Sequence, residues 1–355
     1  MSTFERIRES IASLSFEDQL ERRSVFRTID MHTCGEPLRV VLHGLPKLNS
    51  TSILGKRTEI MQSHDHIRKL LIHEPRGHAD MYGCYLVEPE RPEADFGIVF
   101  MHNEGYSTMC GHGTIAITKL AYILQWKQNN KEVFTLELDV PCGSIKSFID
   151  QDADQEFAVR FQGVPSFVLR DNLTIEVRKY GDILFDIAYG GAFYAYVDAD
   201  RLGLSLASKN IGGIIEAGKE IKAAIIGAGI PVLHPIEKDL SFLYGVIFRS
   251  KITETSANYR NVCVFADGEV DRSPTGSGLC GFLALLRHKK MLGVGDHLIV
   301  ESVISSRFEG QILNDRNFFG YQAVDPLVGG NAYVVGDQFF YLDPEDPIRE
   351  GFFLR

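Results

Sequence analysis

The chain has 355 residues, and at roughly 150 residues per domain this length predicts two domains. Hydrophobic residues make up 45% of it and charged residues 24%, a balance that excludes a disordered or fibrous chain. The 47 acidic residues outnumber the 37 basic ones, and the net charge of −10 argues against a nucleic acid as partner.

The sequence also argues against a membrane or secreted protein. The longest uncharged stretch, residues 223–236, has 14 residues and two prolines, whereas a spanning helix needs about 20 apolar residues. Charges near the N-terminus stand where a secretory signal needs its apolar segment. The six cysteines are scattered and form no CxxC pair, which favours free, mostly buried thiols. We therefore expect a cytoplasmic protein with no membrane partner.

Hydrophobic periodicity predicts a first cycle of strands and helices. An amphipathic helix is expected over the first 20 residues, with an apolar face of Phe4, Ile7, Ile11 and Leu14. Strands are expected at 25–32, 37–44, 82–89, 96–102, 132–140 and 156–161, and helices at 58–73 and 110–126. The expected core contacts of the last helix are Ile115, Leu120 and Ile123.

A second cycle of the same plan begins after the glycine pair at 190–191. Its expected strands are 192–198, 242–248 and 261–267, and its expected helices are 217–226 and 275–291. In both halves, one helix is therefore expected to begin directly after a strand and a turn, at residue 110 and at residue 275.

The two late helices begin alike. One opens with CGHG at 110–113 and the other with TGSG at 275–278, and the starts are 165 positions apart. Free N–H groups at a helix start, with glycines that allow close approach, can hold a carboxylate or phosphate. Two such starts facing each other would hold one small anion between them.

Cys110 stands where a thiol is expected to be most acidic. The helix dipole and the unpaired N–H groups stabilise a thiolate, which predicts a pKa below the free value of about 8.5. An ordinary buried cysteine is the alternative, but the flanking glycines and the following His112 favour a reactive thiol. His112 could bind substrate or tune the thiol.

No cofactor or metal is expected. The histidines at 64, 66, 73 and 78 fit no zinc pattern, and we interpret His64 and His66 as solvated helix positions. Neither glycine motif has the GxGxxG or GxxxxGK[ST] form of a nucleotide site.

Three motifs together resemble the proline racemase family: DMHTCGEPLR at 30–39, MCGHGTIA at 109–116 and DRSPTGSG at 271–278. The similarity runs in order from about Arg27 to LDPEDPIREGF near the C-terminus. Within the family, EPRGHADMYGCYLV and HNEGYSTMCGH are similar to the branch that dehydrates trans-3-hydroxy-L-proline.

This resemblance implies an α/β fold of two similar domains, as in diaminopimelate epimerase. Each domain is a curved sheet around a central helix, and the active site lies in the cleft between them. Residues 1–190 would form the domain that carries Cys110, with the tail at about 340–355 packed back on it. Residues 191–340 would form the domain that carries Thr275.

The resemblance also assigns the chemistry. Racemases of the family use two cysteines on opposite faces of the substrate α-carbon, at the positions of Cys110 and Thr275 here. A threonine hydroxyl is a far weaker acid than a thiol, so two-face racemisation is disfavoured. A one-base β-elimination needs no second thiol, and the family's dehydratases carry threonine at this position.

The expected function is therefore that of a lyase. It would dehydrate trans-3-hydroxy-L-proline to Δ1-pyrroline-2-carboxylate without a cofactor, with Cys110 abstracting the α-proton. Three alternatives stay open: a proline or hydroxyproline racemase or epimerase on the same scaffold, a silent imino-acid-binding protein, and a diaminopimelate-epimerase-like isomerase.

The stereochemistry of the substrate adds an inference. Its 3-hydroxyl lies on the same ring face as the α-hydrogen, so Cys110 could take the α-proton and return it to the departing hydroxyl. His112 or a water is the alternative donor.

The resemblance to the family implies that backbone N–H groups at both helix starts bind the substrate carboxylate. These are the N–H groups of Gly111, His112, Gly276 and Ser277. Asp271 would hold the ring nitrogen, although it could also cap the turn. Arg272 is expected to serve structure, and the roles of His32, Thr33 and Glu36 stay open. The expected partner is a small imino acid, and a homodimer stays open as the assembly.

Overall fold

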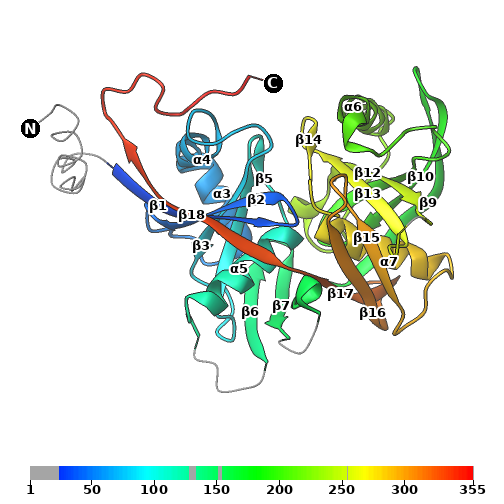
Figure 1. Ribbon diagram of the computed structural model, residues 1–355, viewed down its shortest axis with the longest axis horizontal. Helices are drawn as coiled ribbons and strands as arrows, with labels where there is room; N and C mark the ends of the chain where they lie inside the picture. The colour runs from blue at the N-terminus through cyan, green and yellow to red at the C-terminus, as the bar shows by residue number, and fades with distance from the viewer. Residues whose placement is uncertain (1–23, 128–132, 151–153, 254, 355) are drawn as a thin grey trace, which may run out of the picture.

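The structure is a computed structural model that describes residues 24–127, 133–150, 154–253 and 255–354. The helix expected over the first 20 residues lies outside these ranges. The described chain forms two units, each a curled sheet around one helix, placed side by side (Figure 1). The fold expected from the resemblance is thereby confirmed.

The first unit curls around α5 (Gly111–Ile123), which is buried from Gly111 to Thr118. Its strands, in order of pairing, are β18 (Ala332–Leu342), β1 (Ser24–Thr33), β2 (Glu36–His43), β3 (Tyr82–Val87), β4 (Phe96–His102), β6 (Phe134–Val140), β7 (Gly143–Ile149) and β8 (Val159–Gln162). Two helices, α3 (Ile53–Ser63) and α4 (Asp65–Ile72), pack against β4 through a second apolar cluster.

The second unit is a closed ring of strands around α7 (Gly276–His288). The strands are β9 (Ser166–Val177), β10 (Gly181–Tyr189), β11 (Phe193–Asp198), β12 (Leu243–Lys251), β13 (Tyr259–Phe265), β15 (His297–Glu301), β16 (Arg307–Phe318) and β17 (Tyr321–Gly330). The ring closes because β17 pairs with both β16 and β9. A helix that is buried on all sides, as α7 is from Gly276 to Leu286, must be apolar all round.

The two units are joined by strand pairing and by the chain segment from β17 to β18. β17 also pairs with β8 of the first unit, and after Asn331 the chain continues as β18 beside β1 (Figure 1). The C-terminal segment stays on the first unit, where the Phe352 N–H donates to the Glu74 carbonyl at 2.9 Å. The boundary expected near residue 190 falls between β10 and β11, which pair antiparallel.

The internal repeat extends to the whole plan of each unit. Each unit has two parallel strand pairs, and a parallel pair requires a crossover connection. In the first unit, α3 and α4 connect β2 to β3, and short β5 (Gly105–Tyr106) with α5 connects β4 to β6. In the second, α6 (Ile211–Gly227) connects β11 to β12, and short β14 (Glu269–Val270) with α7 connects β13 to β15. The starts of α5 and α7 are therefore equivalent positions.

Several expected elements differ in the structure. The single helix expected at 58–73 is two helices that meet at His64, and Ser52 sets the earlier start by accepting the Gly55 N–H at 3.0 Å. Ile115 and Leu120 are buried as expected, but Ile123 is 48% exposed because it lies in the last turn of α5. His66 is exposed, whereas His64 is partly buried at the joint.

The sequence patterns do not predict β7, β9, β10 or the strands from β15 to β18. β9 exposes alternate polar positions along much of its length, so a search for apolar runs does not detect it. α6 begins at Ile211, six residues before its expected start, despite the glycines at 212 and 213.

Candidate active site

The starts of α5 and α7 meet at two glycines. A Cβ atom on Gly111 would lie 2.5 Å from the Cα of Gly276, and one on Gly276 would lie 2.7 Å from the Cα of Gly111. Any side chain at either position would force the units apart. The first-turn N–H groups, which have no partner within their own helix, are thus gathered at one place from both units.

Cys110 is the N-cap residue of α5 and is 3% exposed. Its Sγ accepts the Gly113 N–H at 3.1 Å, and a Cβ on Gly113 would lie 2.8 Å from the sulfur. Burial raises the pKa of the thiol well above its ordinary value, the Gly113 N–H opposes this, and Asp271 adds to it. The expectation of a lowered pKa is therefore wrong for this closed arrangement, because burial outweighs the helix start.

His112 lies beside the thiol, with its Nδ1 and Nε2 atoms 3.4 and 3.5 Å from Cys110 Sγ. Its ring packs edge-on against Tyr82 at a centroid distance of 4.8 Å. Burial lowers the pKa of His112 to about 3. The imidazole is therefore neutral at physiological pH and is a poor proton donor there.

Thr275 is the N-cap residue of α7 and has φ +68°. A positive φ is an outlier for a β-branched residue, and such strain persists only where the surroundings enforce it. Gly278 makes room for Thr275, since a Cβ there would lie 3.0 Å from Thr275 Cγ2. Thr275 Oγ1 is buried, and the Thr275 side chain interacts with the Asp271 carboxyl group and the Cys263 thiol.

Two buried carboxyl groups, those of Asp271 and Glu36, line the same cavity as this threonine. The Asp271 carboxylate accepts the Ser273 N–H at 2.8 Å, so it does cap the turn, and burial raises its pKa to about 6. Glu36 accepts the Arg272 N–H at 2.7 Å on Oε2, while its Oε1 has no partner within the described chain. Burial, with a further contribution from Asp271, raises the pKa of Glu36 well above its ordinary value.

Arg272 connects the units. Its Nη1 donates to the Asp80 carbonyl at 2.6 Å, and its main chain holds Glu36. This agrees with the structural role expected for it.

All seven predicted site residues line one small cavity. Its lining consists of Glu36, Tyr82, Met109, Cys110, Gly111, His112, Tyr194, Tyr244, Cys263, Phe265, Asp271, Thr275, Gly276 and Ser277. The sequence motifs do not assign a role to Glu36 and do not predict the tyrosines. The tyrosines come from β3, β11 and β12, and no local motif marks a strand residue that folding alone brings to the cavity. Thr33 acts behind the site, where its hydroxyl donates to the His112 carbonyl at 2.8 Å.

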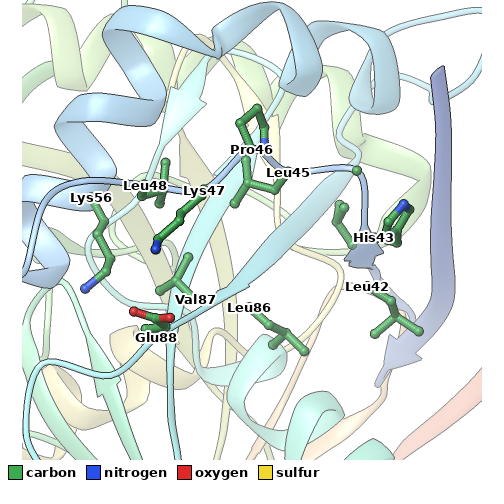
Figure 2. Close-up of a pocket in the computed structure, with 12 residues that line it drawn as sticks. Leu42, His43, Leu45, Pro46, Lys47, Leu48, Lys56, Leu86, Val87 and Glu88 are labelled. Atoms are coloured by element: carbon green, nitrogen blue, oxygen red, sulfur yellow. The ribbon is translucent and has the colours of Figure 1, made fainter.

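A second pocket lies on the surface of the first unit and contains none of the predicted site residues. It is lined by residues 41–48 and 86–88 with Lys56, and its charged side chains include Lys47, Lys56 and Glu88 (Figure 2). The Lys56 ammonium donates to the Thr51 carbonyl at 2.7 Å. This pocket is therefore not a candidate for the same chemistry.

Two further findings concern the whole described chain. Within residues 24–127, 133–150, 154–253 and 255–354, no three His, Cys, Asp or Glu side chains gather as a metal site would require. None of the helices in these ranges is both long and apolar enough to cross a bilayer.

The fold and the cavity define a class: two-unit α/β proteins in which two helix starts, one led by a thiol, meet at a small buried cavity. The particular family follows from comparison. Residues 28–353 match the proline racemase family model, and the chain belongs to this family.

Named relatives are similar over nearly the whole chain. A trans-3-hydroxy-L-proline dehydratase of Colwellia psychrerythraea is 43% identical over 97% of this chain and 98% of its own length. A 3-hydroxyproline 2-epimerase of Burkholderia multivorans is 42% identical over 92% of this chain and 98% of its own. The solved structure of a hydroxyproline epimerase from Agrobacterium vitis with bound trans-4-hydroxy-L-proline has a TM-score of 0.85 at 28% identity, covering 93% and 96% of the two chains.

Proposed function

We propose that this protein is a hydro-lyase that dehydrates trans-3-hydroxy-L-proline to Δ1-pyrroline-2-carboxylate without a cofactor. One observation carries the proposal: a thiol leads one helix start of the cavity, and a threonine, whose hydroxyl is a far weaker acid than a thiol, leads the other. The dehydratase relative supports the same substrate and reaction.

In this proposal the two helix starts hold the substrate carboxylate. The N–H groups of Gly111 and His112 face it from one unit, and those of Gly276 and Ser277 face it from the other. Asp271 accepts a hydrogen bond from the ring nitrogen, because an ionised carboxylate pairs well with an ammonium group. The two faces of the α-carbon then point toward Cys110 and Thr275.

The elimination uses one base. The Cys110 thiolate takes the α-proton, the electrons of the Cα–H bond form the C2=C3 double bond, and the C3–O bond breaks. The new thiol returns its proton to the oxygen, which leaves as water. The product, Δ2-pyrroline-2-carboxylate, tautomerises to the Δ1 isomer. Neutral His112 supports this assignment, because it leaves Cys110 as the proton donor next to the departing hydroxyl.

The runner-up is 3-hydroxyproline 2-epimerisation, the activity in the name of one relative. Epimerisation needs a group on the Thr275 side that protonates the carbanion. A threonine hydroxyl is too weak an acid for this step at neutral pH, so the site favours elimination.

The test is to incubate the purified protein with trans-3-hydroxy-L-proline, trans-4-hydroxy-L-proline and L-proline in separate reactions. Pyrroline is expected from the first substrate alone, and Cys110→Ala, as the matched inactive control, should form none. D-isomers from the other two substrates would establish epimerisation instead. Binding without any reaction would favour a silent binding protein.

We also propose that the reaction takes place in the cytoplasm. The support is that all six cysteines are free, as is usual in a reducing compartment.

A further inference from the structure

Three hydroxyl groups form a buried chain beside the cavity. Tyr82 Oη is hydrogen-bonded to Ser107 Oγ and lies 3.4 Å from Tyr244 Oη. All three residues are buried, and both tyrosines line the cavity. Tyr82 lies on β3 of the first unit and Tyr244 on β12 of the second, so the pair exists only when the two units meet.

The three hydroxyl groups have more hydrogen-bond donors and acceptors than their mutual contacts use. Three hydroxyls supply three protons, and the two contacts use two of them. Within the described part of the chain, these hydroxyls make no further hydrogen bond. The contact between the tyrosines is also long for O–H···O, which is usually about 2.7–2.8 Å. One donor and several lone pairs therefore remain for a polar group in the cavity.

The tyrosine pair lies on the Cys110 side of the cavity. The Tyr82 ring packs against His112, whose ring nitrogens lie 3.4 and 3.5 Å from Cys110 Sγ. Burial raises the pKa of both phenols, and the nearby Cys110 thiol adds to the effect in each case. Both phenols therefore stay protonated and can donate hydrogen bonds.

We propose that the hydroxyls of Tyr82 and Tyr244 form the subsite for the 3-hydroxyl of the substrate. This inference rests on the proposed function, because the trans-3-hydroxyl lies on the same ring face as the α-hydrogen that Cys110 removes. A group that recognises it must therefore stand on the Cys110 side, where these phenols are. The tyrosines act as specificity residues that hold the leaving oxygen by hydrogen bonds and are unchanged by the reaction.

The test measures binding in the inactive Cys110→Ser background, so that the substrate stays intact. Calorimetry compares trans-3-hydroxy-L-proline with pyrrole-2-carboxylate, a planar ligand without the hydroxyl. Tyr82→Phe and Tyr244→Phe should each weaken binding of the hydroxyproline by roughly three- to tenfold, the usual worth of one hydrogen bond. Binding of pyrrole-2-carboxylate should change by less than about twofold, since no hydrogen bond to it is lost.

Tyr85→Phe is the matched control. Tyr85 lies on the same strand, and its buried hydroxyl has no hydrogen-bond partner among the described residues, but it packs in the cluster beneath α3 and α4. It should alter neither affinity. Pyrrole-2-carboxylate binding also reports that each variant is folded, and the two Tyr→Phe variants test the subsite independently.

The inference is overturned if both Tyr→Phe variants bind the two ligands like the parent, or if they weaken both ligands equally. The proposed function is tested separately, by measuring whether the wild-type protein forms pyrroline. Wild-type activity without selective loss in the variants rejects the subsite alone. Absence of wild-type pyrroline formation rejects the proposed function, and the binding comparison still decides whether the hydroxyl subsite exists.

Discussion

Cys110 and Thr275 occupy equivalent positions, each as the residue before the first turn of a buried helix. In each helix, a glycine three residues on leaves room for the leading side chain, Gly113 for the sulfur and Gly278 for the threonine methyl. The two sites therefore differ mainly in the chemistry of one side chain, and that difference can be tested by a single substitution.

We predict that Thr275→Cys gains α-epimerisation of trans-4-hydroxy-L-proline. A thiol there would face the carbanion from the side opposite to Cys110 and could protonate it. The rate is expected to be low, because misplacement by about 1 Å costs on the order of a hundredfold. Chiral chromatography detects the D-series product. Thr275→Ser, which keeps a hydroxyl, is the control, and equal results for the two variants would show that residue 275 is not the switch.

The pH dependence of kcat/KM should be governed by the Cys110 thiol. The thiolate is the base, and burial raises its pKa, so activity should increase with pH along a limb at or above the ordinary value of about 8.5. His112, with a pKa of about 3, and Asp271, at about 6, have already lost their protons in that range. Initial rates from pH 6 to 10, with a return to pH 7.5 as the stability control, measure the limb. Ionisation of Asp271 accounts for any limb near pH 6, so a profile that is flat from pH 7 to 10 would contradict the assignment to Cys110.

At the scale of elements, the contact between the starts of α5 and α7 should tolerate no side chain. Gly111→Ala places a Cβ 2.5 Å from Gly276 Cα, so the two helix starts must separate. We expect kcat/KM to fall by on the order of a hundredfold, together with a lower melting temperature.

Gly212→Ala is the matched control for that variant. Gly212 lies in the first turn of α6, where an added Cβ meets no atom within 4 Å. Its activity should be unchanged, and its stability should rise by up to about 1 kcal/mol through helix propensity. Similar losses in both variants would show that the glycine contact is not specific.

The starts of α5 and α7 could be predicted because their signals are local: a capping residue followed by glycines. The other residues that line the site could not be predicted from the sequence. Tyr82, Tyr244 and Glu36 reach the cavity from separate strands, and only the closed fold brings them together. For the same reason, the sequence predicts a lowered pKa for Cys110, whereas burial in the structure raises it. The helix start is visible in the sequence, whereas burial is a property of the assembled units.

At the scale of the molecule, the burial of the site implies that the two units move. Cys110, His112, Asp271 and Thr275 are each at most 5% exposed. Contacts between the units hold the closed arrangement, including His102 Nδ1 to Glu269 Oε1 at 3.0 Å and the Arg272 N–H to Glu36. We therefore expect a substrate to reach the thiol through an opening of the interface between the units.

We predict that iodoacetamide labels Cys110 only through this opening and that pyrrole-2-carboxylate suppresses the labelling. At a ligand concentration about ten times its Kd, labelling of Cys110 should slow roughly tenfold, because it follows the unoccupied fraction. Cys34 and Cys142, which are partly buried and do not line the cavity, are internal references. Peptide mass spectrometry resolves the three sites. Equal protection of all three would indicate a general effect on the protein, and no protection would place the ligand elsewhere.

The most direct test of one-base elimination is a proton NMR time course of the wild-type protein with trans-3-hydroxy-L-proline in deuterium oxide. We predict that substrate signals are replaced by those of Δ1-pyrroline-2-carboxylate, with deuterium at C3 from the tautomerisation and no cis-3-hydroxy-D-proline. Cys110→Ala should leave the spectrum unchanged. Accumulation of cis-3-hydroxy-D-proline carrying deuterium at the α-carbon, without pyrroline, would contradict the account and identify the protein as an epimerase.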